Sequence, residues 1–420
     1  MVGCRLNQSE IESMANMIRS QGHEIISESQ QADVIIINTC CVTAKAAADS
    51  RKMIRHVARR SNGQVIVTGC WSTLFSNEAF TLPNVAKVVP NQEKSNLVAE
   101  LLGVPAEVIA ESPLIRLPLP GERRRTRAFI KIQDGCNDHC TFCITRLARG
   151  QSSSMPISLI ERDIQAAIVG GAKEIVITGV QLGSWGRDLN PELSLKDLIS
   201  GLLKDERIKR LRLSSIEPWD LYASFFDLWQ DPRLCRHLHI PLQSGCVSTL
   251  RRMARRITPP EYKALIDQAR NMVPGIAITT DVIAGFPGET DADFEESLVF
   301  IETMGFAGGH VFSYSAMQGA PAASYSDQVP HAIRKDRNCR LRLSLNVSST
   351  RFKERCIGHV YQVLWEKVEQ QGAGVWLRGL TDTYLPVVCE GTLEDWNTIS
   401  NVEIMEIDNE NILLGRSLEN

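Results

Sequence analysis

Short apolar segments alternate with amphipathic stretches from residue 128 onward, and this repeat restricts the possible fold more than any other feature of the chain. Six strand candidates occur at 128–133, 174–178, 210–214, 237–241, 277–283 and 309–314. Helical candidates lie between and after them at 157–169, 194–204, 219–229, 259–271 and 291–304. Consecutive strand–helix units favour parallel strands joined by right-handed crossovers. The pattern therefore predicts an α/β fold whose centre is a partial (βα)6 barrel of the TIM type.

The first hundred residues predict a second, smaller α/β domain. Strand candidates at 34–37 and 65–67 enclose a helical stretch at about 44–60, which is the pattern of a parallel sheet with crossovers. An earlier helix is expected as well, because Asn7 with Glu10 resembles a capping box that precedes an apolar helix face.

The end of the chain consists of short alternating runs that follow a polar, basic helix expected at 331–355. The runs lie at 359–368, 374–390, 398–408 and 411–416. Such alternation predicts a small all-β barrel. We expect the whole chain to divide into an α/β domain at 1–103, a proline-rich linker at 104–127, the central barrel at 128–355 and the small β-barrel at 356–420.

The composition is that of an ordinary globular protein, with 43% hydrophobic residues, 23% charged residues and a formal net charge of -3. No apolar run approaches the ~18–20 residues that span a bilayer, and the first residues lack the basic and apolar regions of a secretion signal. We therefore expect a cytoplasmic protein without a membrane partner. Disulfides are disfavoured in that compartment, so the twelve cysteines indicate metal binding or catalysis.

Three cysteines stand in the spacing C-x3-C-x2-C directly after the first strand of the barrel repeat: Cys136, Cys140 and Cys143. We call them the triplet. Three thiolates can hold a 4Fe–4S cluster and leave one iron open to the amino and carboxylate groups of a ligand. Electron transfer from such a cluster into the sulfonium of S-adenosylmethionine would break a carbon–sulfur bond and release a 5′-deoxyadenosyl radical. A zinc knuckle is the alternative, but no second ligand pair follows at zinc-site spacing.

Three more cysteines occupy equivalent places at the ends of expected strands: Cys4, Cys40 and Cys70. We call them the N-terminal set. Parallel strands with right-handed crossovers bring their carboxyl-terminal loops to one edge, so a second three-cysteine metal site is plausible there. The alternative for each is a small buried hydrophobe, and this is the reading of the six remaining cysteines.

The motifs around both cysteine groups resemble those of the radical-SAM methylthiotransferase family across nearly the whole chain. They are Gly3-Cys4-Arg5-Leu6-Asn7, Asn38-Thr39-Cys40, Thr68-Gly69-Cys70 and the triplet itself. The last segment resembles the family's RNA-binding TRAM domain. Within the family, 178–186 and 214–218 look most like the branch that acts on threonylcarbamoyladenosine in tRNA.

The resemblance implies a transferase that places a methylthio group on C2 of N6-threonylcarbamoyladenosine beside the anticodon. It implies two 4Fe–4S clusters and S-adenosylmethionine, with the triplet as catalytic cluster ligands and the N-terminal set as ligands of the second, sulfur-supplying cluster. The expected partners are tRNA, S-adenosylmethionine, a reducing system and a sulfur donor. Alternatives are methylthiolation of isopentenyladenosine in tRNA or of a ribosomal-protein aspartate, and a non-catalytic RNA-binding metalloprotein.

The same resemblance suggests contacts to S-adenosylmethionine. Phe142 resembles an aromatic residue whose backbone lies near adenine, and Gly179 and Glu217 follow the second and third barrel strands, where ligand loops belong. Gln243 and Asp281 are further candidates. A turn at Gly179 and a solvated carboxylate at Glu217 are the alternatives.

Basic residues cluster in four places where an RNA backbone could bind: 51–60, 123–127, 251–256 and 334–342. The final barrel adds aromatic residues, some of which could stack on bases: Trp365, Trp376, Tyr384 and Trp396. The alternatives are solvated helix faces for the basic runs and core packing for most of the aromatic residues.

Overall fold

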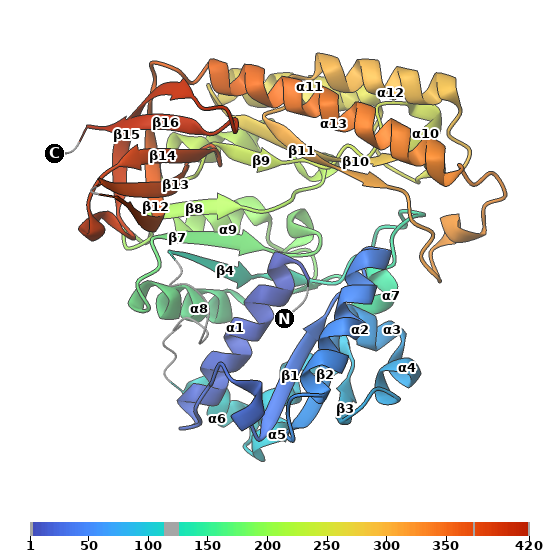
Figure 1. Ribbon diagram of the computed structural model, residues 1–420, viewed down its shortest axis with the longest axis vertical. Coiled ribbons are helices and arrows are strands. Elements are labelled where there is room, and N and C mark those ends of the chain that lie inside the picture. The colour runs from blue at the N-terminus through green and yellow to red at the C-terminus, as the bar shows by residue number, and fades with distance from the viewer. Residues whose placement is uncertain (1–2, 113–125, 373, 419–420) are drawn as a thin grey trace. The chain divides into compact units, whose positions relative to one another are not determined.

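The computed structural model describes residues 3–112, 126–372 and 374–418 (Figure 1). The chain forms two compact units. Unit 1 consists of Met1–Gly171, Thr178–Glu192 and Met317–Ala323. Unit 2 consists of Ala172–Ile177, Leu193–Ala316 and Ser324–Asn420. The domain boundaries expected from the sequence stay a prediction.

Unit 1 contains a parallel sheet in the order β1 (Val34–Thr39), β2 (Gln64–Gly69) and β3 (Val85–Val89). The register pairs Thr39 with Gly69, so β1 and β2 end side by side. The helices of this part are α1 (Arg5–Ser20), α2 (Ala44–Ala58), α3 (Cys70–Leu74), α4 (Ser76–Phe80), α5 (Leu97–Leu102) and α6 (Ala106–Glu111). The predicted N-terminal α/β part is thus confirmed.

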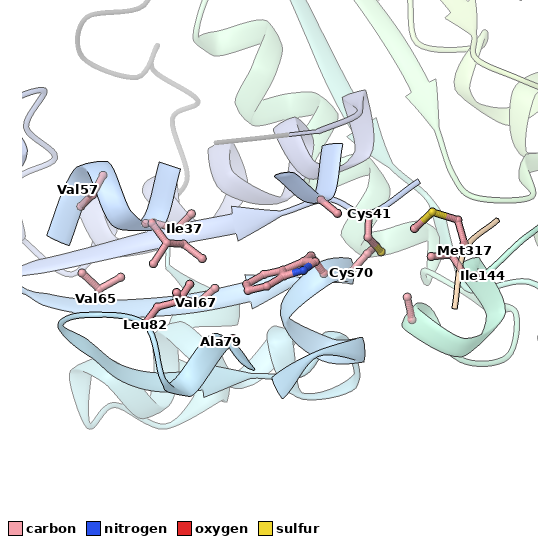
Figure 2. Packing of buried hydrophobic residues seen from close by; sticks show 14 of the residues in the cluster. Ile37, Cys41, Val57, Val65, Val67, Cys70, Ala79, Leu82, Ile144 and Met317 are labelled. Carbon is pink, nitrogen blue, oxygen red and sulfur yellow. The ribbon is translucent and has the colours of Figure 1, made fainter. Parts of the chain in front are cut away.

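Both faces of this sheet are buried, which explains the unbroken apolar runs of its strands. Val65 and Val67 of β2 pack in one hydrophobic cluster with Ile54 of α2 (Figure 2). Ile66, which points to the other face, packs with Met14 of α1. Because successive side chains of β2 point to opposite faces of the sheet, the strand packs against one helix on each face.

The capping box predicted at Asn7 and Glu10 is wrong. Helix α1 already begins at Arg5, and Cys4 is its N-cap without a side-chain hydrogen bond. Asn7 and Glu10 therefore lie inside the helix, where both are buried. Their polar groups contact the buried side chain of Arg149 instead.

The rest of unit 1 carries the triplet. Its elements are β4 (Arg127–Lys131), β5 (Gln133–Asp134), β6 (Ser153–Ser154), α7 (Thr145–Arg149) and α8 (Ile157–Val169), and β5 pairs with β6 in an antiparallel ladder. Within the predicted linker, Ala106–Glu111 forms α6, and 113–125 lie outside the described residues.

Unit 2 contains the remaining strands of the predicted central repeat. They are β7 (Glu174–Thr178), β8 (Arg210–Leu213), β9 (His237–His239), β10 (Ala277–Ala284) and β11 (Gly308–Ser313). Parallel ladders join β7 to β8, β9 to β10 and β10 to β11, and parallel bridges join the regions of β8 and β9. The helices are α9 (Leu195–Leu202), α10 (Val247–Arg252), α11 (Pro259–Met272), α12 (Asp291–Thr303) and α13 (His331–Glu354). The helix expected at 219–229 is replaced by the 3-10 segments Pro218–Asp220 and Ala223–Gln230.

The end of the chain forms the predicted small β-barrel, which is closed in the order β12-β13-β14-β16-β15. Its strands are β12 (Val360–Gln371), β13 (Gly374–Thr381), β14 (Pro386–Glu390), β15 (Ile399–Ile407) and β16 (Leu413–Ser417). Trp365 is fully buried and donates from its indole nitrogen to Ser400 Oγ at 2.7 Å, so this tryptophan belongs to the core. Trp376, Tyr384 and Trp396 are half-buried.

A buried ionic cluster joins this barrel to the start of β7 and β8. Arg212 pairs with Glu174 at 2.8 Å, and both side chains are 0% exposed. The guanidinium groups of Arg210 and Arg212 also donate to the backbone carbonyl of Thr381, at 2.8 and 3.1 Å. None of the described helices has both the length and the apolar composition of a membrane span.

Candidate active site

The triplet lies on the loop that follows β5. Gly135 opens this loop with a φ of +68°, and a Cβ atom there would lie 1.9 Å from the carbonyl oxygen of Gln151. Glycine is therefore required for this close approach. The next residue, Cys136, is fixed by its backbone N–H, which donates to the carbonyl of Gly150 at 3.2 Å.

The three thiols of the triplet lie near enough for the charges of Cys140 and Cys143 to act on Cys136, and all three residues are half-buried. The pKa of Cys136 is raised to about 12, mainly by burial and also by the nearby charges of Asp138, Cys143 and Cys140. Backbone N–H groups of Asp138 and Thr145 point at the sulfurs of Cys136 and Cys143, each at 3.4 Å. Because metal ligation needs deprotonated thiols, these donors favour the state that a cluster requires.

Two glutamine side chains hold the triplet loop in place. Gln181 accepts from the Cys136 thiol at 3.4 Å and donates to Asp138 at 2.7 Å. Gln133 donates to the carbonyl of Gly135 at 2.9 Å and accepts from the backbone N–H of Gln181 at 2.8 Å. A Cβ atom on Gly179 would lie 3.0 Å from the Gln133 side chain, so glycine leaves the room for this contact.

The N-terminal set also comes together. Cys40 and Cys70 directly follow Thr39 and Gly69, the last paired residues of β1 and β2. Burial raises the pKa of Cys40 to about 11, and the charges of Cys4 and Cys70 add to this shift. Cys4 is exposed, whereas Cys40 and Cys70 are buried.

Glycines allow this convergence of the N-terminal set. Gly69 has a φ of +101°, and a Cβ atom there would lie 2.3 Å from the carbonyl oxygen of Thr39. Gly3 has a φ of +128°, and its Cβ would lie 2.8 Å from that of Cys40. Larger residues at these two positions would push the cysteine loops apart.

Cys70 differs from the other thiols because its pKa is lowered, to about 6. The largest cause is a hydrogen bond from the Cys41 thiol. The positive charges of Arg149 and Lys94 lower the pKa as well, and together these effects exceed the opposite effect of burial. Arg149 Nε lies 3.2 Å from Cys70 Sγ. This sulfur is thus stabilised as a thiolate.

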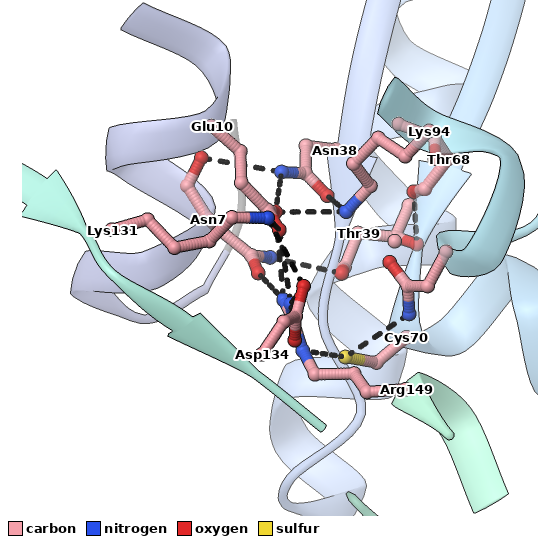
Figure 3. A network of polar contacts seen from close by, with 12 residues as sticks. Asn7, Glu10, Asn38, Thr39, Thr68, Cys70, Lys94, Lys131, Asp134 and Arg149 are labelled. Atoms are coloured by element: carbon pink, nitrogen blue, oxygen red, sulfur yellow. Dashed lines mark hydrogen bonds and ion pairs between the residues drawn. The ribbon is translucent and has the colours of Figure 1, made fainter. Parts of the chain in front are cut away.

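A buried ionic network lies beside Cys70 and reaches it through Arg149 (Figure 3). Glu10 of α1 lies at its centre and pairs with Lys94 at 2.8 Å, with Arg149 at 2.9 Å and with Lys131 at 3.3 Å. Although burial alone would raise the pKa of Glu10, these three cations hold it well below its ordinary value. Asp134 completes the network by pairing with Arg149 at 2.9 Å and Lys131 at 3.1 Å.

Sequence reasoning missed the network residues and both glutamines as site residues. The available signal was Glu10, which lies four positions before Met14 on the face that was expected to be apolar. A carboxylate on a buried helix face needs a cationic partner. The partners themselves come from distant segments, which periodicity along α1 does not identify.

Both groups of cysteines have a donor chemistry that fits an iron–sulfur cluster. In each group the charges of the three cysteines act on one another, and N–H donors point at the sulfurs of Cys136, Cys143 and Cys70. The triplet is half-buried. The assignment of the six cysteines as ligands stays a prediction.

Among the predicted S-adenosylmethionine contacts, Phe142 and Gly179 lie in unit 1 with the triplet. Phe142 is half-buried. Glu217, Gln243 and Asp281 lie in unit 2.

Within unit 2, Gln243 has a φ of +73°, and its backbone N–H donates to the carbonyl of Asp281 at 2.8 Å. The Asp281 carboxylate pairs with His239 at 3.3 Å. Glu217 accepts from Arg255 at 2.7 Å, so it is not a freely solvated carboxylate. The roles of all five residues toward the cofactor stay predictions.

Some of the basic residues expected on an RNA-binding surface are used inside unit 2. Arg255 is buried against Glu217, and Arg337 is buried against Glu289 at 2.8 Å. The run at 123–125 lies outside the described residues.

Comparisons with known proteins assign the two parts that carry the cysteines. Residues 1–90 match the model of "Uncharacterized protein family UPF0004", and residues 130–301 match that of the radical SAM superfamily. The threonylcarbamoyladenosine tRNA methylthiotransferase MtaB of Thermotoga maritima is 35% identical over 391 residues, which are 91% of this chain and 88% of that protein. MtaB of Bacillus subtilis is 33% identical over 96% of this chain and 92% of its own length.

A more distant relative is the tRNA-2-methylthio-N(6)-dimethylallyladenosine synthase of Clostridium tetani, which is 29% identical over 96% of this chain and 92% of that protein. The solved structure of the radical S-adenosylmethionine methyltransferase TsrM from Kitasatospora setae shares the fold, with a TM-score of 0.54 and 14% identity over 72% of this chain and 71% of that one. By its matched segments and its relatives, the chain belongs to the radical-SAM methylthiotransferase family.

Proposed function

We infer that this protein is a radical-SAM enzyme that adds a methylthio group to C2 of N6-threonylcarbamoyladenosine in tRNA. The observation that carries this function is the 33–35% identity to two MtaB enzymes over more than nine-tenths of the chain. The synthase that acts on dimethylallyladenosine is 29% identical over a similar length.

The enzyme uses S-adenosylmethionine and 4Fe–4S clusters. We assign the triplet as the ligands of one cluster and the N-terminal set as the ligands of another, because each set converges in unit 1 with donors aimed at its sulfurs. When bound, the cluster at the triplet supplies the electron that splits S-adenosylmethionine into methionine and a 5′-deoxyadenosyl radical.

Residues of the chain position the triplet for this reaction. Gln181 and Gln133 hold the loop of the triplet through hydrogen bonds to the Cys136 thiol and to the carbonyl of Gly135. Gly179 keeps the space beside Gln133 free of a side chain. Phe142, half-buried beside Cys143, is expected to bring its backbone near the adenine of S-adenosylmethionine.

The substrate is tRNA, and this supports a cytoplasmic location. We expect the enzyme to draw also on a reducing system and a sulfur donor. We expect the small β-barrel and the exposed basic residues of 251–256 and 334–342 to contact the RNA backbone.

The function is tested by mass spectrometry of tRNA nucleosides from a strain that lacks the gene. We expect loss of the methylthio form of threonylcarbamoyladenosine, which returns when the gene is supplied again. A gene carrying Cys136→Ala, Cys140→Ala and Cys143→Ala should fail to restore it. Cys339→Ala, which alters an exposed cysteine outside both sets, is the matched control and should restore it fully.

Each alternative predicts a different result in the same strain. Loss of the methylthio form of isopentenyladenosine would assign the chain to the activity of the Clostridium tetani relative. Loss of methylthio from a ribosomal-protein aspartate would assign a protein substrate. Unchanged tRNA and ribosomal proteins, with no cleavage of S-adenosylmethionine by the reconstituted protein, would favour the non-catalytic metalloprotein.

A further inference from the structure

One arginine side chain contacts both cysteine-bearing regions of unit 1 (Figure 3). Arg149 donates from Nε to Cys70 Sγ at 3.2 Å and from Nη1 to Asp134 at 2.9 Å. It also donates to Glu10 at 2.9 Å and from Nη2 to Asn7 at 2.8 Å. Its side chain is only 2% exposed. All three guanidinium nitrogens therefore have fixed partners, and one partner is a predicted cluster ligand.

The ionic network around Arg149 carries an excess of positive charge. Its ion pairs join three cations (Lys94, Lys131 and Arg149) to two carboxylates (Glu10 and Asp134). Glu10, Lys94 and Arg149 have side chains at most 5% exposed. An uncompensated charge is costly at such a place, so the network favours an anion at its border.

The Cys70 sulfur is where that anion fits. Besides Arg149, the thiol of Cys41 and the amide of Asn91 donate to it, the latter at 3.7 Å. Asn91 is itself anchored, because its amide also donates to the carbonyl of Ala148 at 2.7 Å. Three donors from three different segments thus converge on one sulfur.

The same arginine lies next to the loop of the triplet. Asp134 precedes Cys136 by two positions, and the backbone N–H of Cys136 donates to the carbonyl of Gly150, the residue after Arg149. Helix α7 carries Arg149, and its N-cap Ile144 belongs to the same hydrophobic cluster as Cys70 (Figure 2). A shift of the guanidinium group would therefore change the contacts of Cys70 and of Asp134, which precedes the triplet.

We propose that Arg149 is a positioning residue of the second cluster, which fixes the Cys70 sulfur and makes the cluster at the N-terminal set easier to reduce. This rests on the proposed function, in which that set holds a 4Fe–4S cluster. Hydrogen bonds to cluster sulfurs and nearby positive charge stabilise the reduced, more negative state, and so raise the reduction potential. Lysine keeps the charge but loses the fork of donors, whereas glutamine loses both.

The test uses the full chain, reconstituted without oxygen, in which the triplet is replaced by alanines so that only the N-terminal set can hold iron. Redox titration followed by electron paramagnetic resonance should give a lower midpoint potential for Arg149→Lys and a still lower one for Arg149→Gln. Arg146→Lys makes the same change at an exposed residue of the same helix and should leave the potential unchanged.

The outcomes separate this role from a structural one. If Arg149→Lys and Arg149→Gln bind the same amount of iron at an unchanged potential and only unfold more easily, Arg149 merely supports the fold and the proposal is wrong. If the chain that keeps Arg149 but lacks the triplet binds no iron, the N-terminal set holds no cluster and the proposal is wrong. The radical chemistry is tested separately, by the iron that the triplet binds in the unaltered chain.

A measurement without any substitution at Arg149 covers the case in which its variants do not fold. The protein is labelled with nitrogen-15 only in its arginine residues, and its cluster is chemically reduced to the paramagnetic state. Pulsed electron paramagnetic resonance then detects any nitrogen-15 that is coupled to the cluster. The Nε–H···S contact should give a nitrogen-15 coupling in the chain that lacks the triplet. Absence of this coupling would show that no arginine donates to the cluster and would overturn the proposal.

Discussion

Replacement of Glu10 by glutamine tests whether the buried network supports unit 1 as its geometry implies. Glutamine keeps the size of the side chain but removes the negative charge that three cations share. Glu10 is 3% exposed and Lys94 is 5% exposed, so water replaces little of the lost interaction. Breaking a buried pair of this kind costs about 3–5 kcal/mol.

The lower end of that range is expected for Glu10→Gln. Burial already lowers the pKa of Lys94, so Lys94 can release its proton once Glu10 no longer holds it. This relief limits the cost to about 3 kcal/mol, which corresponds to a change of roughly 150-fold in a local opening equilibrium. The deficit should shrink as the pH rises, because neutral Lys94 then forms more readily.

Hydrogen exchange of peptides from α1 and β1 measures this local opening in the full chain. The matched control is Glu100→Gln, which breaks the pair with Lys87 at 2.6 Å, where both side chains are about half exposed. An exposed pair contributes only about 0–1 kcal/mol. Equal changes in exchange for the two variants would refute the argument from burial.

The pH dependence provides a second check on Glu10. Its pKa is lowered in the folded chain, so its contribution is complete above the unfolded carboxyl pKa of about 4.3 and is lost as the pH falls through the folded value. The unaltered chain and Glu10→Gln should therefore converge in stability in acid. A difference that persists below both pKa values would contradict this assignment.

Three other outcomes are expected. Iron analysis of the reconstituted chain should give on the order of eight irons, and Cys40→Ala with Cys70→Ala should reduce this to about four; an unchanged count would contradict the second cluster. Gly179→Ala places a Cβ 3.0 Å from Gln133 and should weaken S-adenosylmethionine binding, measured by calorimetry, while the iron count stays the same. Glu217→Gln should weaken that binding about tenfold if Glu217 touches the cofactor; lower thermal stability with unchanged affinity would assign it to its arginine partner alone.

Much of the fold follows from periodicity. The parallel strands of both α/β parts and the closed barrel at the end were predicted because each strand is a short apolar or alternating run between turn residues. The helix expected at 219–229 was wrong. Pro218 and the aromatic run that follows favour short 3-10 turns there, which a count of apolar residues does not distinguish from an α-helix.

The candidate site was predicted in part. The proximity of Cys40 and Cys70 could be predicted from the sequence, because residues that follow two neighbouring parallel strands lie side by side. The roles of Asn7 and Glu10 could not, because their spacing fits a helix cap equally well. Only the position of Arg149, more than a hundred residues away, shows that both side chains turn toward a buried guanidinium.

The pair formed by Glu10 and Arg149 also limits how such a chain can be assembled from parts. Glu10 lies in the segment matched by one family model and Arg149 in the segment matched by the other, yet they share one buried ion pair. A chimaera that joined the first segment to the second segment of a relative without this arginine would bury carboxylates that lack their partner. Either segment can therefore be exchanged only for one that keeps its side of this ion pair.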